Sequence, residues 1–229
     1  MRIEAVVFDF DGLLMDTEGT MLASWQYEWR QHGLELDVAG FFADHGGDLS
    51  QHRYAELALA VGPGFDRQAS HTRRLAYRDG LNARLGLQPG IAQWLDEAVA
   101  LGLRLAIATS SPRHWPLALL SRTGFLDRFE VLACGDEVAG PKPDPGVYQL
   151  ALTRLGVPPD VAVAVEDTAH GVAAAQTTGM RCVAIPGPLA DRTRFSTAEL
   201  VLSSAAEASL AEVIARVGAV VAEGVPQRS

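Results

Sequence analysis

Short apolar runs alternate with amphipathic segments along most of the chain. The runs are rich in Val, Ile, Leu and Ala, as buried strands are, and they cover residues 3–9, 103–108, 130–133, 161–165 and 181–185. Between and after them, apolar residues recur at helical spacing at about 90–101, 112–122, 144–155, 168–178 and 205–222. Short strands separated by helices of this length indicate parallel βαβ units. We therefore expect an α/β fold built on a doubly wound parallel sheet.

Residues 17–82 depart from this alternation. They hold no convincing strand pattern, and their helical stretches lie at about 18–32, 37–44, 50–61 and 66–82. An all-α domain inserted after the first strand is the simplest explanation. The expected domains are a core of residues 1–16 and 83–229 and a small helical cap of residues 17–82.

Composition narrows the class of protein. The chain has 229 residues, of which 48% are hydrophobic, so it can bury a sizeable core, and its formal net charge of −9 argues against nucleic acid or an anionic membrane as a partner. It carries no signal-peptide pattern and no apolar run of membrane-spanning length. We expect a cytoplasmic protein, a monomer or at most a weak dimer, that binds a small molecule. Cys134 and Cys182 show no metal-ligand spacing and are expected to be small buried thiols.

The end of the first predicted strand carries two aspartates. In Asp9-Phe10-Asp11-Gly12, alternate residues of a strand point to the same side, so both carboxylates are expected to project together. Two such charges repel unless a cation or a shared proton holds them. The pattern favours Mg²⁺-dependent phosphoryl transfer over a structural role.

The second predicted strand ends in Ala108-Thr109-Ser110-Ser111-Pro112. Ser111 is a good helix N-cap residue and Pro112 suits a first helical position. Thr109 or Ser110 would then face a helix N-terminus, where free backbone N–H groups attract an anion. A capping sequence without further function is the alternative, which the position beside Asp9 disfavours.

Lys142 is the only lysine of the chain, beside 18 arginines. It lies in Gly140-Pro141-Lys142-Pro143-Asp144-Pro145, where the prolines stiffen the backbone before a predicted helix. A cation at a helix N-terminus opposes the helix dipole, so its position needs another cause. A point charge that pairs with phosphate and carboxylate supplies one.

The fourth predicted strand ends in two acidic residues, Glu166 and Asp167, after Val-Ala-Val-Ala-Val. Adjacent carboxylates beside a buried strand are costly unless a metal or a cation receives them, and Mg²⁺ prefers such oxygen ligands. We expect one of the two to bind metal directly and the other to act through water or to accept from Lys142. The alternative is that one of them only caps the next helix.

With these motifs in this order, the chain resembles the haloacid dehalogenase (HAD)-like hydrolase superfamily. The resemblance covers essentially the whole chain and rests on Asp9-x-Asp11-Gly12, Thr109/Ser110, Lys142 and Glu166-Asp167, with the insert after the first motif. It points to the subgroup with a helical cap, which includes β-phosphoglucomutase and phosphoglycolate phosphatase. It implies a Mg²⁺-dependent phosphatase that hydrolyses a small phosphomonoester such as a sugar phosphate.

The resemblance also implies roles for these residues. Asp9 would be the nucleophile that forms an aspartyl-phosphate, and Asp11 would protonate the leaving alcohol and then activate water. Lys142 with Thr109 or Ser110 would bind the phosphoryl group. The metal would be held by the Asp9 side chain, the Asp11 main-chain carbonyl and Asp167, with Glu166 as a further candidate. Closure of the cap would exclude water.

Departures from the family separate its members. Haloacid dehalogenases lack the second aspartate, present here as Asp11, and phosphonatases need a lysine in the cap, which this insert does not contain. The main alternative is a sugar phosphate mutase. Its cap-linker histidine aligns with Met21 here, and its phosphate-binding arginine aligns near Gly46–Leu49, with Arg53 the nearest arginine. A non-catalytic sugar-phosphate sensor is a third hypothesis, which the complete set of motif residues disfavours.

The insert offers weaker signals. His45, Asp48 and Arg53 lie in or beside a predicted cap loop and are candidates for substrate specificity, although a solvated surface role is the simpler interpretation. Met21, Trp25 and Trp29 form a stripe at helical spacing and are expected to be the packed face of the cap. The basic stretch of His71, Arg73, Arg74 and Arg78 is expected to be a solvated face, with a grip on an acidic substrate as the alternative.

Overall fold

The computed structural model describes residues 2–41 and 49–223. The chain divides into two compact units, one of which combines Met1–Met15 with Gly86–Ser229 while the other is Asp16–Leu85. The second unit contains the stretch 17–82 in which the sequence shows no strand pattern.

The first unit is built on one six-stranded sheet whose strands all pair in parallel. Its order is β3-β2-β1-β4-β5-β6, so the direction of winding reverses between β1 and β4. The predicted α/β fold with a doubly wound parallel sheet is confirmed. The strands are β1 Ala5–Phe8, β2 Arg104–Ala108, β3 Val131–Ala133, β4 Ala162–Glu166, β5 Arg181–Ala184 and β6 Leu200–Val201.

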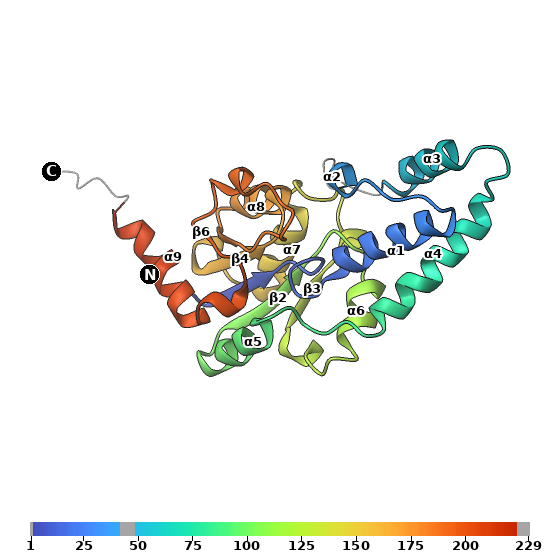
Figure 1. Cartoon of the computed structure of the whole chain (residues 1–229). Coiled ribbons are helices and arrows are strands. Elements are labelled where there is room, and N and C mark those ends of the chain that lie inside the picture. The colour runs from blue at the N-terminus through green and yellow to red at the C-terminus, as the bar shows by residue number, and fades with distance from the viewer. Residues whose placement is uncertain (1, 42–48, 224–229) are drawn as a thin grey trace. The chain divides into compact units, whose positions relative to one another are not determined.

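Helices cover both faces of this sheet, with α7 and α8 on one side and α5 and α9 on the other (Figure 1). Alternate strand residues such as Ala5 and Val7 pack with Val147 and Tyr148 of α7 and Val172 of α8 in one buried cluster. The helices are α5 Ile91–Ala100, α6 His114–Leu120, α7 Gly146–Leu155, α8 Ala169–Thr177 and α9 Leu210–Glu223. Short 3₁₀ helices are η1 Leu126–Arg128, η2 Gly135–Glu137, η3 Pro159–Val161, η4 Arg192–Phe195 and η5 Ala205–Glu207.

Two helices begin later than the sequence predicts. α6 starts at His114 after Arg113, so the expected cap at Ser111 is wrong, and the Ser111 hydroxyl bonds a carboxylate instead. α9 starts at Leu210 rather than near residue 205, because Ala205–Glu207 forms a separate 3₁₀ turn. In both places a tertiary contact or a tighter turn competes with the helical pattern.

The second unit is all-helical over the residues described. Its helices are α1 Thr17–Gln31, α2 Val38–Phe41, α3 Ser50–Val61 and α4 Arg67–Asn82. Trp25, Phe41 and Tyr54 form its buried centre, and Met21 and Trp29 pack against them. The tryptophan stripe of α1 is therefore the packed face, as predicted.

The basic stretch of α4 is not the solvated face that the sequence predicts. The Arg74 guanidinium is buried, lies 4.3 Å from the centre of the Trp25 ring and donates to the Tyr54 hydroxyl at 2.8 Å. Arg73 pairs with the buried Glu28 of α1 at 2.6 Å. α4 packs along α1, and the polar groups that α1 buries there are matched by guanidinium groups.

Both cysteines are free and buried, as predicted. Burial raises the pKa of the Cys134 thiol to about 11, which keeps it protonated at neutral pH. None of the helices in the described stretches 2–41 and 49–223 is long and apolar enough to cross a membrane.

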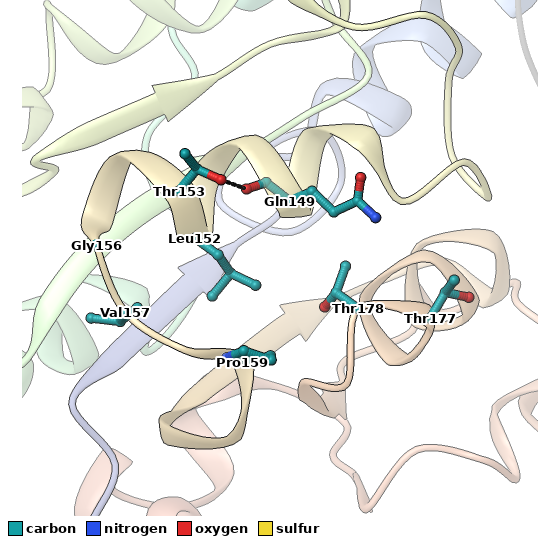
Figure 2. A pocket seen from close by; sticks show the side chains of 8 residues that line it. All are labelled: Gln149, Leu152, Thr153, Gly156, Val157, Pro159, Thr177 and Thr178. Atoms are coloured by element: carbon teal, nitrogen blue, oxygen red, sulfur yellow. Dashed lines mark hydrogen bonds between the residues drawn. The ribbon is translucent and has the colours of Figure 1, made fainter.

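A shallow depression lies between the C-terminal parts of α7 and α8 (Figure 2). Its rim carries the side chains of Gln149, Thr153, Thr177 and Thr178, and Leu152 and Pro159 form its apolar floor. Because these helix ends precede the next strands, the depression lies at the amino-terminal edge of the sheet. The chemistry-bearing motifs lie at the opposite edge.

Candidate active site

The predicted motif residues meet at the carboxyl-terminal edge of the sheet. Phe8 of β1 is in register with Ile107 of β2 and Val165 of β4, so the residues that follow these strands are neighbours. The Asp9 N–H donates to the Val165 carbonyl at 2.9 Å, which continues the pairing one residue beyond β1. This edge, at the point where the winding reverses, is where ligands bind in open α/β sheets.

The Lys142 ammonium lies at the centre of the cluster. It donates to the Asp9 carboxylate, to Oε1 of Glu166 at 2.5 Å and to the Tyr148 hydroxyl at 3.4 Å. Its side chain is only 7% exposed. Burial by itself would lower the pKa of Lys142, but the charges of Asp9 and Glu166 outweigh it and raise the pKa, so the ammonium stays charged.

Glu166 is held by the start of α8 and by a tyrosine. Its Oε2 accepts from the N–H groups of Asp167 and Thr168 at 3.2 and 3.4 Å and from the Thr168 hydroxyl at 3.2 Å. The Tyr148 hydroxyl donates to Oε1 at 2.5 Å. A Cβ atom at Gly171 would lie 1.9 Å from the Glu166 carboxyl carbon, so only glycine leaves room there.

Thr168, and neither acid, caps this helix. Its side chain accepts from the Gly171 N–H at 3.1 Å. The alternative in which Glu166 or Asp167 serves only as a cap is therefore wrong, and the Glu166 carboxylate accepts from Lys142 and Tyr148.

Asp11 is held by the segment that follows β2. Its Oδ2 accepts from the Ser111 hydroxyl at 2.6 Å and from the Thr109 hydroxyl at 3.4 Å, and its Oδ1 accepts from the Trp115 indole N–H at 2.8 Å. The Ser110 hydroxyl faces the lysine loop instead, where it accepts from the Lys142 backbone N–H at 3.1 Å. The segment after β2 thus contacts both Asp11 and the loop that carries Lys142.

Three of the acidic groups could share a cation. Asp9, Glu166 and Asp167 are all buried, and one carboxylate oxygen from each lies within 4.8 Å of the others. Both oxygens of Glu166 already accept hydrogen bonds, whereas Asp9 accepts from Lys142 through Oδ1 and no described residue donates to its Oδ2. Glu166 is therefore the least suited of the three to bind a metal directly, and carboxylate oxygens suit Mg²⁺.

The electrostatics of Asp9 fit the same interpretation. Burial raises its pKa, Lys142 opposes that rise, and the nearby charges of Glu166 and Asp11 reinforce it. Asp9, Asp11, Glu166 and Asp167 thus gather in a region with one ammonium group, which contacts two of them, and a divalent cation would offset the excess negative charge. The Asp11 side chain is not in the three-carboxylate cluster, which leaves its main-chain carbonyl as the predicted ligand.

The cap candidates contribute less. His45 and Asp48 lie outside the described residues, as do Gly46 and Gly47. Arg53 is buried, with its guanidinium 3.7 Å from the centre of the Phe41 ring and a hydrogen bond of 3.2 Å to the Phe41 carbonyl. A solvated role for Arg53 is therefore wrong, and a role in specificity stays a prediction.

Sequence reasoning missed Trp115 and Tyr148. Each lies near the start of the helix that follows a motif loop, α6 after the Thr109 segment and α7 after Lys142. An aromatic residue with a polar group at that position, one turn from a motif, is the signal that could have identified both.

Comparison with known proteins places this geometry in a family. Residues 6–185 match the model of the family described as haloacid dehalogenase-like hydrolase. Protein CbbY of Rhodobacter capsulatus is 36% identical over 211 residues, which cover 87% of this chain and 92% of that protein. Hexitol phosphatase B of Escherichia coli is 32% identical over 233 residues, covering 93% and 97%.

A solved structure agrees with these relatives. CbbY from Rhodobacter sphaeroides, in complex with phosphate, matches with a TM-score of 0.68 at 33% identity and covers 91% of this chain and 98% of that one. The predicted superfamily and the predicted enzyme class, a HAD-like hydrolase, are confirmed. The family model and the relatives span most of the chain, and the motifs meet at one edge of the sheet: the chain belongs to the haloacid dehalogenase-like hydrolase family.

Proposed function

We propose that this protein is a Mg²⁺-dependent phosphoric monoester hydrolase that acts on a small phosphorylated metabolite of the sugar phosphate kind through an aspartyl-phosphate on Asp9. The observation that carries the proposal is the contact of the buried Asp9 with Lys142 inside a cluster of carboxylates. Supporting it, one relative is named a hexitol phosphatase and a related structure holds phosphate.

A phosphomonoester dianion is repelled by the carboxylate that must attack it. Lys142 offsets part of this charge, because its ammonium already lies against Asp9 and can follow the charge that develops on the phosphoryl oxygens. Mg²⁺ held by Asp9 and Asp167 would supply the remaining positive charge when bound. Attack by Asp9 forms an Oδ–P bond and breaks the ester P–O bond.

Asp11 moves the proton in both half-reactions. It gives a proton to the leaving alkoxide as the ester bond breaks, and it then takes one from the water that attacks phosphorus. That attack breaks the bond between Asp9 and phosphorus and releases inorganic phosphate. The Thr109 hydroxyl lies beside Asp11, where it can donate to a phosphoryl oxygen.

Glu166 and Tyr148 keep Lys142 in place. Both contact the ammonium, and Glu166 is itself fixed by the start of α8. Glu166 therefore acts as the counter-ion of the lysine, and Asp167 has the more direct role at the metal. The hydrogen bonds of Glu166 support this division between the two acids.

Phosphate release from a panel of phosphomonoesters tests the proposal. The panel contains glucose 6-phosphate, sorbitol 6-phosphate, glycerol phosphate and phosphoglycolate, each with Mg²⁺ and with EDTA. We expect Mg²⁺-dependent release from at least one ester. Conversion of glucose 1-phosphate to glucose 6-phosphate without phosphate release would instead favour the mutase, and silence in both assays would favour the sensor.

A further inference from the structure

Trp115 contacts the residue that the proposed mechanism uses as acid and base. Its indole N–H donates to Oδ1 of Asp11 at 2.8 Å. The side chain is half-buried, and the Trp115 backbone N–H is bonded to the Pro112 carbonyl at 2.9 Å. Pro116 follows in the same turn and has a fixed φ. Trp115 thus contacts Asp11 from the first turn of α6.

The two oxygens of Asp11 face chemically different partners. An indole N–H can only donate, so Oδ1 must always be an acceptor. The hydroxyls of Ser111 and Thr109, which face Oδ2, can donate or accept. A proton on Oδ1 would oppose the indole hydrogen, whereas a proton on Oδ2 is tolerated because a hydroxyl can rotate and accept.

We propose that Trp115 is a positioning residue that orients Asp11 and makes Oδ2 the oxygen through which its proton is transferred. Oδ2 also lies beside Thr109, a predicted phosphate-binding residue, so the proton is held on the side where the ester would bind. This inference rests on the proposed phosphatase function.

Esters with different leaving groups distinguish a positioning role of Trp115 from a purely structural role. An alkoxide needs a proton as the ester bond breaks, whereas p-nitrophenolate is a good leaving group that needs little help. The ratio kcat/KM reports the steps up to phosphoryl transfer to Asp9 and excludes the later attack by water. It therefore isolates the step in which Asp11 acts as an acid.

The experiment compares Trp115→Phe with wild type on the best alkyl ester of the panel and on p-nitrophenyl phosphate. We expect kcat/KM to fall about 10- to 100-fold on the alkyl ester and less than about threefold on the aryl ester. Ser111→Ala, which removes the principal hydroxyl at Oδ2, is expected to show the same selectivity. His114→Ala, an exposed neighbour on α6, serves as the control and should change neither.

An equal loss on both esters would show a structural role and overturn the inference, as would no loss on either. Wild type that hydrolyses neither ester would overturn the proposed function itself, which is a different result. A second measurement does not depend on a folded Trp115 variant. In the wild-type spectrum, one of the four indole N–H proton resonances should move on Asp11→Asn. No movement would contradict the contact.

Discussion

At Lys142, one ammonium group meets two carboxylates and a phenol in a space that is almost closed to solvent. A guanidinium is larger and planar, and its donors diverge as a fork, whereas the ammonium is compact and can point at Asp9, Glu166 and Tyr148 at once. This explains why a lysine suits this position better than an arginine.

Replacing Lys142 should affect both catalysis and stability. In Lys142→Met we expect kcat to fall at least about 100-fold, because a charge that stabilises the transition state is lost. The free energy of unfolding should fall by about 3–5 kcal/mol, because Asp9 and Glu166 remain buried without their cation. Steady-state kinetics and urea unfolding in EDTA measure the two effects.

A companion variant tests the physical cause. Lys142→Arg keeps the charge but should recover less than about a tenth of the activity, since the fork does not match the site. Adding Glu166→Gln to Lys142→Met should restore part of the lost stability, because one unpaired buried charge is gone. No recovery in the double variant would contradict the charge argument.

The position of a residue can be predicted where its motif lies in one short stretch of sequence at the end of a strand or in a rigid turn. Asp9 and Asp11 follow β1, Glu166 ends β4 and Lys142 lies in a proline-rich turn, so their position at one edge follows from the fold class. A local sequence pattern cannot predict contacts with side chains that are distant in sequence, and such contacts determine the roles of Trp115, Tyr148 and Arg74. Hydrophobic spacing alone cannot show that a guanidinium packs on Trp25.

Among the structural elements, the turns at the strand ends position the candidate catalytic residues. Gly135 opens η2 after β3, and its N–H donates to the Ser111 carbonyl at 2.9 Å. A Cβ atom there would lie 2.0 Å from the Ser110 carbonyl oxygen, which is backbone and cannot rotate away. The close approach of two backbones therefore sets the position of the Thr109–Ser111 segment.

Gly135→Ala should consequently displace that segment. We expect kcat/KM to fall at least about tenfold and the free energy of unfolding to drop by about 1–3 kcal/mol, as in overpacked sites. Gly187→Ala is a matched control in the loop after β5, with no atom within 4 Å of the added Cβ and no positive φ. Equal activity of both variants would show that the close approach is not needed.

The observed bounds of β1 to β5 agree closely with the apolar runs in the sequence. These runs are recognisable because apolar residues recur with different periods in buried strands and in crossover helices. β6 is missed because Leu200–Val201 is too short to show any period, and it forms a strand through its pairing with β5. The start of α6 is missed because Ser111 has two possible partners, the helix end and Asp11, and the second prevails.

For the whole molecule, the strand order brings motifs from distant parts of the sequence to one edge, where four carboxyl groups gather and the one ammonium group contacts only two of them. Such a site gains stability from a bound cation. Mg²⁺ at about 100 times its Kd should stabilise the folded protein by about 2.7 kcal/mol and raise Tm by about 5–10 °C.

This shift should depend on the proposed ligands. Asp167→Asn is expected to lose most of the Mg²⁺-induced rise in Tm in a thermal melt with and without the ion. Glu137→Gln, in the separate group of Cys134, Asp136 and Glu137, should keep it. A rise that survives Asp167→Asn unchanged, or that disappears in Glu137→Gln, would place the ion elsewhere.

The most direct test of the account is the replacement of the proposed nucleophile. Asp9→Asn keeps the size and shape of the side chain but removes the attacking carboxylate, so phosphate release from the best ester should fall at least about 1,000-fold in Mg²⁺. Circular dichroism must show that the variant is folded. Loss of turnover in a folded variant is the predicted result, whereas Mg²⁺-dependent turnover near the wild-type rate would contradict catalysis through Asp9.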